Sequence, residues 1–107
     1  MAIEVFLTDD ALDDLQDIAD YLSTTESADI ASRIVGKIEE VYVRLAEFPN
    51  RGAIPHELSE LGMRDFRQVF FKPYRIIYKV VEDRAVVYVI ADGRRDMRTL
   101  LRRRLLR

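Results

Sequence analysis

The chain has 107 residues, a formal net charge of −2 and no cysteine, which together predict one domain and exclude disulfides and thiolate metal sites. Apolar residues make up 49% and charged residues 34% of the sequence, a balance typical of a folded protein and too apolar for disorder. No apolar run approaches the roughly 18 residues of a membrane span, and no signal peptide is recognisable, so we expect a soluble, cytoplasmic protein without a membrane partner.

The N-terminal third is predicted to form a strand and a helix. The strand runs from Ile3 to Leu7, and Thr8 is a suitable N-cap for a helix that extends to about Leu22. One side of this helix is apolar, and the other carries Asp10, Asp13, Asp14, Asp17 and Asp20. We interpret the aspartates as a solvated face and expect neither a metal nor a cofactor, because metal ligands must converge rather than form a row.

A second helix is predicted from Ala28 to Phe48, after a polar turn over residues 23–27. Its apolar residues recur every three or four positions, and Pro49 ends it. The two helices form a hairpin whose natural partner is the apolar face of a sheet. Beyond the hairpin, residues 57–61 favour a short helical turn, and the single histidine, His56, is interpreted as an exposed loop residue.

Three strands are predicted in close succession, over Phe66 to Phe71, Tyr74 to Val81 and Ala85 to Ile90. The breaks between them are so short that neighbouring strands must run antiparallel. Arg67 and Arg75 lie on neighbouring strands and could share a face with Lys79. These three cations are candidate binding residues, since basic side chains recur on adjacent strands.

A last helix is predicted from Met97 to Leu106, with Asp96 as its cap and Leu100 and Leu101 turned inward. Arginines crowd this end of the chain: Arg94, Arg95, Arg98, Arg102, Arg103, Arg104 and Arg107. Residues 1–60 carry 14 acidic and 4 basic side chains, whereas residues 61–107 carry 5 and 13. This division predicts an acidic outer face and a basic surface that meets an acidic partner.

The predicted order of elements gives an α+β fold: an N-terminal strand, an α-helical hairpin, a three-stranded antiparallel meander and a short C-terminal helix. Together with the turn Pro49-Asn50-Arg51-Gly52, the segment Tyr74-Arg75-Ile76-Ile77-Tyr78 and the terminal stretch from Val89 to Met97, this order resembles the RelE/ParE superfamily of toxins from bacterial type II toxin–antitoxin systems. The resemblance covers essentially the whole chain and implies a single RelE/ParE-like toxin domain over residues 1–107, of the kind also called a plasmid stabilisation protein.

The resemblance implies two alternative activities. RelE-like members are ribosome-dependent mRNA endonucleases, and carrying their site over would make Arg75 and Arg95 catalytic. ParE-like members are binding proteins that poison DNA gyrase. The C-terminal tyrosine of the nucleases would fall near Leu101, which cannot transfer a proton, and neither His nor Tyr follows Tyr88.

The missing C-terminal tyrosine and the acidic net charge favour the ParE-like activity, with gyrase as the target. On this interpretation the chain has no catalytic residue. We also expect it not to bind nucleic acid sequence-specifically on its own. A third alternative is a toxin-like binding module without activity. The implied partner is a cognate antitoxin, ParD-like or similar, which would dock in the apolar groove beside the helices or on the basic surface. The residues expected to bind target or antitoxin are Arg67, Arg75, Lys79, Arg94, Arg95, Arg98 and Arg102.

Overall fold

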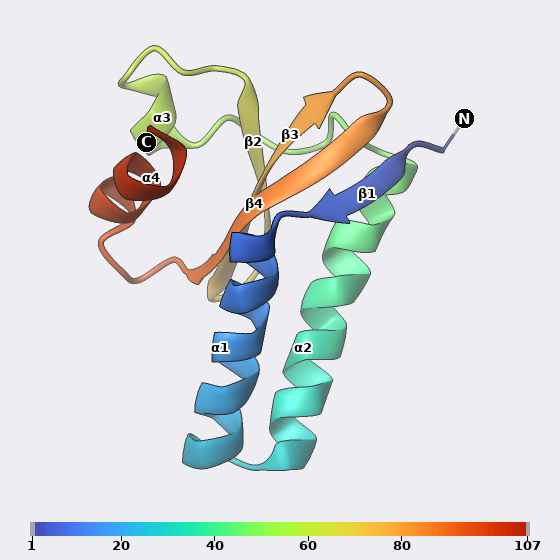
Figure 1. The fold of residues 1–107 in the computed structure, drawn as a ribbon, viewed down its shortest axis with the longest axis vertical. Coiled ribbons are helices and arrows are strands. Elements are labelled where there is room, and N and C mark those ends of the chain that lie inside the picture. Colours follow the sequence, from blue (N-terminus) through green and yellow to red (C-terminus); the bar gives the residue numbers. More distant parts are fainter. Residues whose placement is uncertain (1, 107) are drawn as a thin grey trace.

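A computed structural model describes residues 2–106 (Figure 1), so Met1 and Arg107 of the expected domain lie outside the described residues. It contains the predicted α+β elements in the predicted order. They are β1 (Glu4–Leu7), α1 (Asp9–Thr25), α2 (Ala28–Val43), the 3₁₀ turn η1 (Arg44–Ala46), α3 (His56–Ser59), β2 (Phe66–Phe71), β3 (Tyr74–Val81), β4 (Arg84–Asp92) and α4 (Met97–Leu105). Within residues 2–106, no helix is both long and apolar enough to cross a membrane.

The four strands form one sheet in the order β1-β4-β3-β2. β2, β3 and β4 are the expected antiparallel meander. β1 joins its far edge by pairing with β4 in parallel, with Glu4 opposite Arg84 and Leu7 opposite Val87. The helical hairpin between β1 and the meander supplies the long crossover that a parallel pair requires.

One face of the sheet is covered by α1 and α2, which run next to each other (Figure 1). The apolar sides of both helices meet Tyr74, Ile76 and Tyr78 of β3 and form the main core. Ile38 of α2 is fully buried there. The predicted apolar sides of the two helices, and their predicted packing on a face of the sheet, are therefore confirmed.

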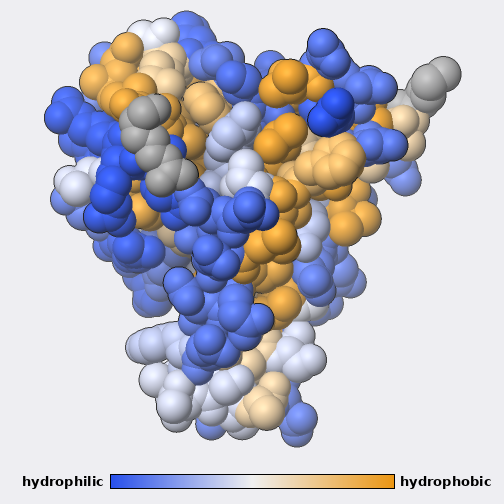
Figure 2. Space-filling model, viewed as in Figure 1, coloured by the Kyte–Doolittle hydropathy of each residue, from blue (hydrophilic) through white to orange (hydrophobic). Residues whose placement is uncertain are grey.

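The opposite, outer face of the sheet is partly covered by α3 and α4. Leu58, Leu100 and Leu101 from these helices pack with Ile77 and Val89 of the sheet in a second core. In the view of Figure 2, hydrophilic residues gather around α4, whereas an apolar stripe lies over β1 and β4. The outer layer is therefore short and leaves part of the sheet exposed.

The helical hairpin differs from the prediction at its ends. α1 continues to Thr25, and the hydroxyls of Thr24 and Thr25 donate to carbonyls one turn earlier, so these polar side chains are satisfied within the helix. The connecting turn is correspondingly shorter, and the Ser27 hydroxyl caps α2 by accepting from the Ile30 N–H. α2 itself ends at Val43, and η1 leads the chain toward Pro49.

Candidate functional site

Arg67 does not share a face with Lys79, so that expectation was wrong. The strand register places Arg67 opposite Tyr78 and Phe66 opposite Lys79, and residues that face each other across two strands project to the same side. Arg67 therefore lies on the side of the helical hairpin. Its guanidinium donates to the carbonyls of Asn50 at 3.2 Å and Gly52 at 2.7 Å. Arg67 therefore stabilises the loop that follows the helical hairpin.

Arg75 projects from the outer face and is held by a carboxylate. Both terminal nitrogens of its guanidinium donate to Glu57 of α3 at 2.8 Å, and its Nε donates to the Gln68 side chain at 2.8 Å. The two side chains are only 11% and 18% exposed. The hydrogen bonds from Arg75 lower the pKa of Glu57 to about 2, so the pair stays ionised at neutral pH and the positive charge of Arg75 is compensated.

Arg95 follows β4 and lies away from Arg75, on the other side of the sheet. It lines a pocket between α1 and the ends of β3 and β4. Leu101, near which the resemblance would place the C-terminal tyrosine of the nucleases, is 1% exposed inside the second core. The groups that the resemblance implies for a nuclease therefore do not converge on one point.

The remaining predicted cations fall into two groups. Lys79, Arg94 and Arg98 pair with neighbouring carboxylates, at 3.5 Å, 2.6 Å and 2.8 Å respectively. In contrast, the side chains of Arg95 and Arg102 are exposed and make no ion pair or hydrogen bond within residues 2–106. The same holds for Arg103, which was not among the residues expected to bind. The charge of these three arginines is therefore available to another molecule.

Sequence reasoning missed the role of Asp14. Its carboxylate accepts two hydrogen bonds from Arg104 of α4, at 2.9 and 3.0 Å, and a third from the backbone N–H of Ile90 at 2.9 Å. Arg104 also donates to the Tyr88 carbonyl at 2.8 Å. A signal was present in the sequence, since Asp14 lies at helical spacing between the apolar residues Ala11 and Ile18.

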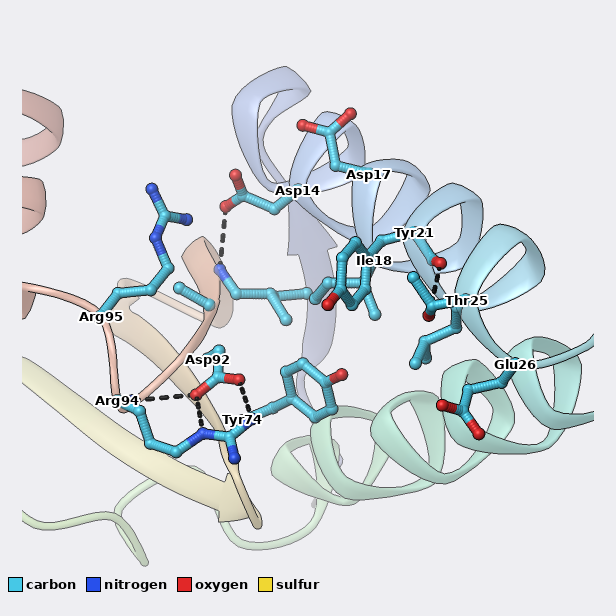
Figure 3. Close-up of a pocket in the computed structure, with 13 residues that line it drawn as sticks. Asp14, Asp17, Ile18, Tyr21, Thr25, Glu26, Tyr74, Asp92, Arg94 and Arg95 are labelled. Carbon is cyan, nitrogen blue, oxygen red and sulfur yellow. Dashed lines mark hydrogen bonds and ion pairs between the residues drawn. The ribbon is translucent and has the colours of Figure 1, made fainter.

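The pocket that Arg95 lines has a volume of about 570 Å³. In Figure 3, Tyr21 of α1 and Tyr74 of β3 reach toward each other from opposite walls, with Ile18 close to them. Burial, together with the nearby Asp92 carboxylate, raises the pKa of Tyr74. Hydrogen bonds from Arg94 lower the pKa of Asp92, so this pair at the pocket edge is ionised.

The described residues show no metal-binding arrangement, because within residues 2–106 no group of three or more His, Cys, Asp or Glu side chains converges. Of the five aspartates predicted to form a solvated face on this helix, Asp14 points inward to Arg104, whereas Asp13, Asp17 and Asp20 are exposed.

Solved structures with similar folds include three toxins or toxin complexes. The chromosomal ParDE toxin–antitoxin system from P. aeruginosa matches with a TM-score of 0.72 and 22% identity, over 85% of this chain and 96% of that one. The toxin–antitoxin complex RelBE2 from Mycobacterium tuberculosis matches with a TM-score of 0.63 and 17% identity, over 86% and 99%. A free arginine-to-alanine mutant of E. coli toxin RelE matches with a TM-score of 0.65 and 15% identity, over 94% and 93%.

At these identities the three structures establish the fold alone. No curated protein sequence matches the chain. The sequence model of one family, described as the ParE toxin of the type II toxin–antitoxin system parDE, matches residues 5–97. That match spans β1 to the start of α4 and covers most of the chain, so the protein belongs to the ParE toxin family of type II toxin–antitoxin systems.

Proposed function

We propose that this toxin acts as a binding protein that poisons DNA gyrase and is neutralised by a cognate antitoxin. The observation that carries the proposal is the bidentate ion pair between Arg75 and Glu57, in which both terminal guanidinium nitrogens donate to the carboxylate at 2.8 Å. A nuclease built on Arg75 would need that charge to stabilise a developing phosphate charge. In this structure the Glu57 carboxylate, whose pKa is strongly lowered, already accepts hydrogen bonds from the Arg75 guanidinium.

The C-terminal tyrosine that the resemblance implies for proton transfer is the second group that a nuclease site of this kind lacks here. Leu101 is buried and apolar, and general acid–base groups contribute typically about 10²–10⁴-fold to such reactions. Tyr78, the tyrosine that follows Arg75 most closely, uses its hydroxyl to hold Pro49 and Gly52. The RelE-like alternative would thus have to work without an accessible arginine at position 75 and without the C-terminal tyrosine of the nucleases.

Binding to an acidic protein surface uses cations that are exposed and unpaired, rather than cations that are already held in ion pairs. Arg102 and Arg103 are exposed on α4, and their side chains make no ion pair within residues 2–106. Two neighbouring free arginines on one helix favour an acidic surface on the target, because complementary charges accelerate encounter and select the partner. We assign this pair to contact with gyrase.

The test uses purified, antitoxin-free protein in two parallel reactions. One contains gyrase, ATP and supercoiled plasmid, and the other contains translating ribosomes with a reporter mRNA. We expect gyrase-dependent cleavage of the plasmid and intact mRNA. Cut mRNA with unaffected gyrase would overturn the proposal in favour of the RelE-like activity, and no effect in either reaction would favour a binding module without toxicity.

A further inference from the structure

The loop after the helical hairpin is held in place on both sides of Arg51. The fully buried Tyr78 accepts a hydrogen bond from the Gly52 N–H at 3.1 Å and donates one to the Pro49 carbonyl at 2.7 Å. Arg67 of β2 donates to the Gly52 carbonyl at 2.7 Å. A Cβ atom at Gly52 would lie 2.6 Å from a carbonyl oxygen of β2, so the close approach of the loop to the sheet requires glycine. Side chains from two strands therefore fix this loop to the sheet.

Arg51 itself takes no part in fixing the loop. Its side chain is exposed and makes no ion pair or hydrogen bond with any residue from 2 to 106, and the same is true of Arg44 in η1. An exposed loop usually loses backbone freedom when it binds a partner, whereas the backbone beside Arg51 is already fixed. The structure thus presents a free arginine on a preorganised loop.

Arg51 and Arg44 line one groove, of about 460 Å³, between the end of α2, the loop and the edge strand β2. Its walls are apolar, since Val41 comes from α2 and Val69 and Phe70 come from β2. Phe70 is 49% exposed although it is aromatic. No carboxylate is among the described residues that line the groove. The groove therefore combines two uncompensated positive charges with an apolar wall.

The chemistry of the groove fits an acidic protein surface. A second copy of the chain, docked groove to groove about a two-fold axis, would bring the same cations together, and like charges repel. A nucleic acid would offer phosphates to the two arginines but would leave the walls formed by Val41 and Val69 without an apolar partner. An acidic protein segment supplies both carboxylates and apolar side chains.

We propose that this groove is a second contact surface for gyrase, in which carboxylates of the target meet Arg51 and Arg44 and an apolar side chain packs against Phe70. A guanidinium suits this contact because it binds a carboxylate with two parallel hydrogen bonds. Tyr78 and Arg67 are positioning residues, since they hold the loop that carries Arg51. The inference rests on the proposed function, because gyrase is the partner, and none of the residues that line the groove comes from α4.

The test measures the dissociation constant between purified, antitoxin-free toxin variants and intact gyrase bound to a DNA fragment. Arg51→Glu and Arg44→Glu are each expected to weaken binding about 5- to 20-fold, because a carboxylate would then face the acidic target. Phe70→Ala is expected to weaken it about 3- to 10-fold through the lost apolar contact. Arg33→Glu, an exposed charge reversal on α2, and Phe48→Ala, a truncation at a 52% exposed aromatic residue, are matched controls expected to change binding less than about twofold. Thermal unfolding of each variant checks that it remains folded.

A double-variant series tests whether Arg67 acts through Arg51. Arg67→Met removes the hydrogen bonds to the loop carbonyls and keeps most of the apolar stem. It is expected to weaken gyrase binding about threefold in the wild-type background, because the loop must then be ordered on binding. In the Arg51→Ala background it is expected to have no further effect. Equal losses in both backgrounds would overturn the positioning role of Arg67.

The outcomes distinguish the groove from the proposed function. If the wild type does not bind gyrase, the proposed function fails and the inference fails with it. If the wild type binds but Arg51→Glu, Arg44→Glu and Phe70→Ala bind equally well, the groove alone is overturned. Binding of the same variants to the DNA fragment without gyrase, and to the product of the gene adjacent to that of the toxin, is measured in parallel. Losses confined to either of these would assign the groove to that partner and overturn the gyrase contact.

Discussion

Arg104 and Asp14 are joined by two hydrogen bonds, at 2.9 and 3.0 Å, although 90 residues separate them in the chain. This bridge ties α4 to α1, and its third and fourth contacts, to the Ile90 N–H and the Tyr88 carbonyl, tie both helices to β4. α4 is a short helix, and most of its own surface is charged. Its position on the sheet therefore depends on this bridge as well as on its apolar side.

Replacing Asp14 by alanine should destabilise the protein by about 1–3 kcal/mol. It removes the two shortest carboxylate contacts of the mostly buried Arg104 guanidinium, which keeps the Tyr88 carbonyl and the Asp10 carboxylate at 3.7 Å, and it leaves the Ile90 N–H without its acceptor. Denaturant unfolding measures this loss. Asp13→Ala, on the exposed side of the same helix, is the control and should stay within about 0.5 kcal/mol of the wild type. If the double replacement Asp14→Ala/Arg104→Met were as unstable as the sum of both single ones, the two residues would not be coupled.

The Arg75–Glu57 pair should make stability depend on pH. The pKa of Glu57 falls from 4.5 to about 2 in the folded protein, so the unfolded chain binds this proton more readily. The stabilisation, about 3 kcal/mol, is then fully present above pH 4.5 and is lost as the pH falls toward 2.

Unfolding free energies of the wild type and Glu57→Gln, measured between pH 7 and pH 2, test this dependence. The difference between the two proteins should be largest above pH 4.5 and should shrink toward pH 2. If the difference in unfolding free energy between the two proteins stayed constant from pH 7 to pH 2, ionisation of the Glu57 carboxylate would not contribute to stability. Glu47→Gln, at an exposed position without an ion pair in the described chain, should show no such trend.

The strands were more predictable than the contacts between elements. The bounds of β2 and β3 follow from the local alternation of residues and from the turns beside them. The N-caps of α1 and α4 are equally local, because the side chains of Thr8 and Asp96 accept hydrogen bonds from N–H groups three residues later. The parallel pairing of β1 with β4 depends on chain segments about 80 residues apart, and no local pattern specifies it.

The candidate site was less predictable for the same reason. Every arginine after β4 looks alike in the sequence, and only the fold shows that Arg104 is a structural brace whereas Arg102 and Arg103 are free. Arg67 was misplaced because a strand residue's face depends on its exact register with the neighbouring strand. The roles of Glu57 and Gln68 beside Arg75 depend equally on tertiary packing.

The hydroxyl of Tyr78 should stabilise the loop that contains Pro49 and Gly52, after the helical hairpin. This side chain is fully buried, accepts the Gly52 N–H at 3.1 Å and donates to the Pro49 carbonyl at 2.7 Å. Tyr78→Phe leaves both groups without this partner and should cost about 1–3 kcal/mol in unfolding free energy. Tyr42→Phe is the control and should cost less, because the Tyr42 hydroxyl makes no hydrogen bond within residues 2–106. Equal losses for both would contradict the role given to Tyr78.

The most direct test of gyrase poisoning through exposed arginines is a concentration series of toxin in a gyrase cleavage reaction. It compares the wild type, the double variant Arg102→Glu/Arg103→Glu and the control Arg33→Glu, each confirmed as folded by its thermal unfolding. We expect the double variant to need at least about 10-fold more protein for half-maximal plasmid cleavage, since two charge reversals oppose an acidic target surface. The control should match the wild type. Equal potency of all three proteins would contradict the assignment of Arg102 and Arg103, and absence of cleavage by the wild type would contradict gyrase as the target.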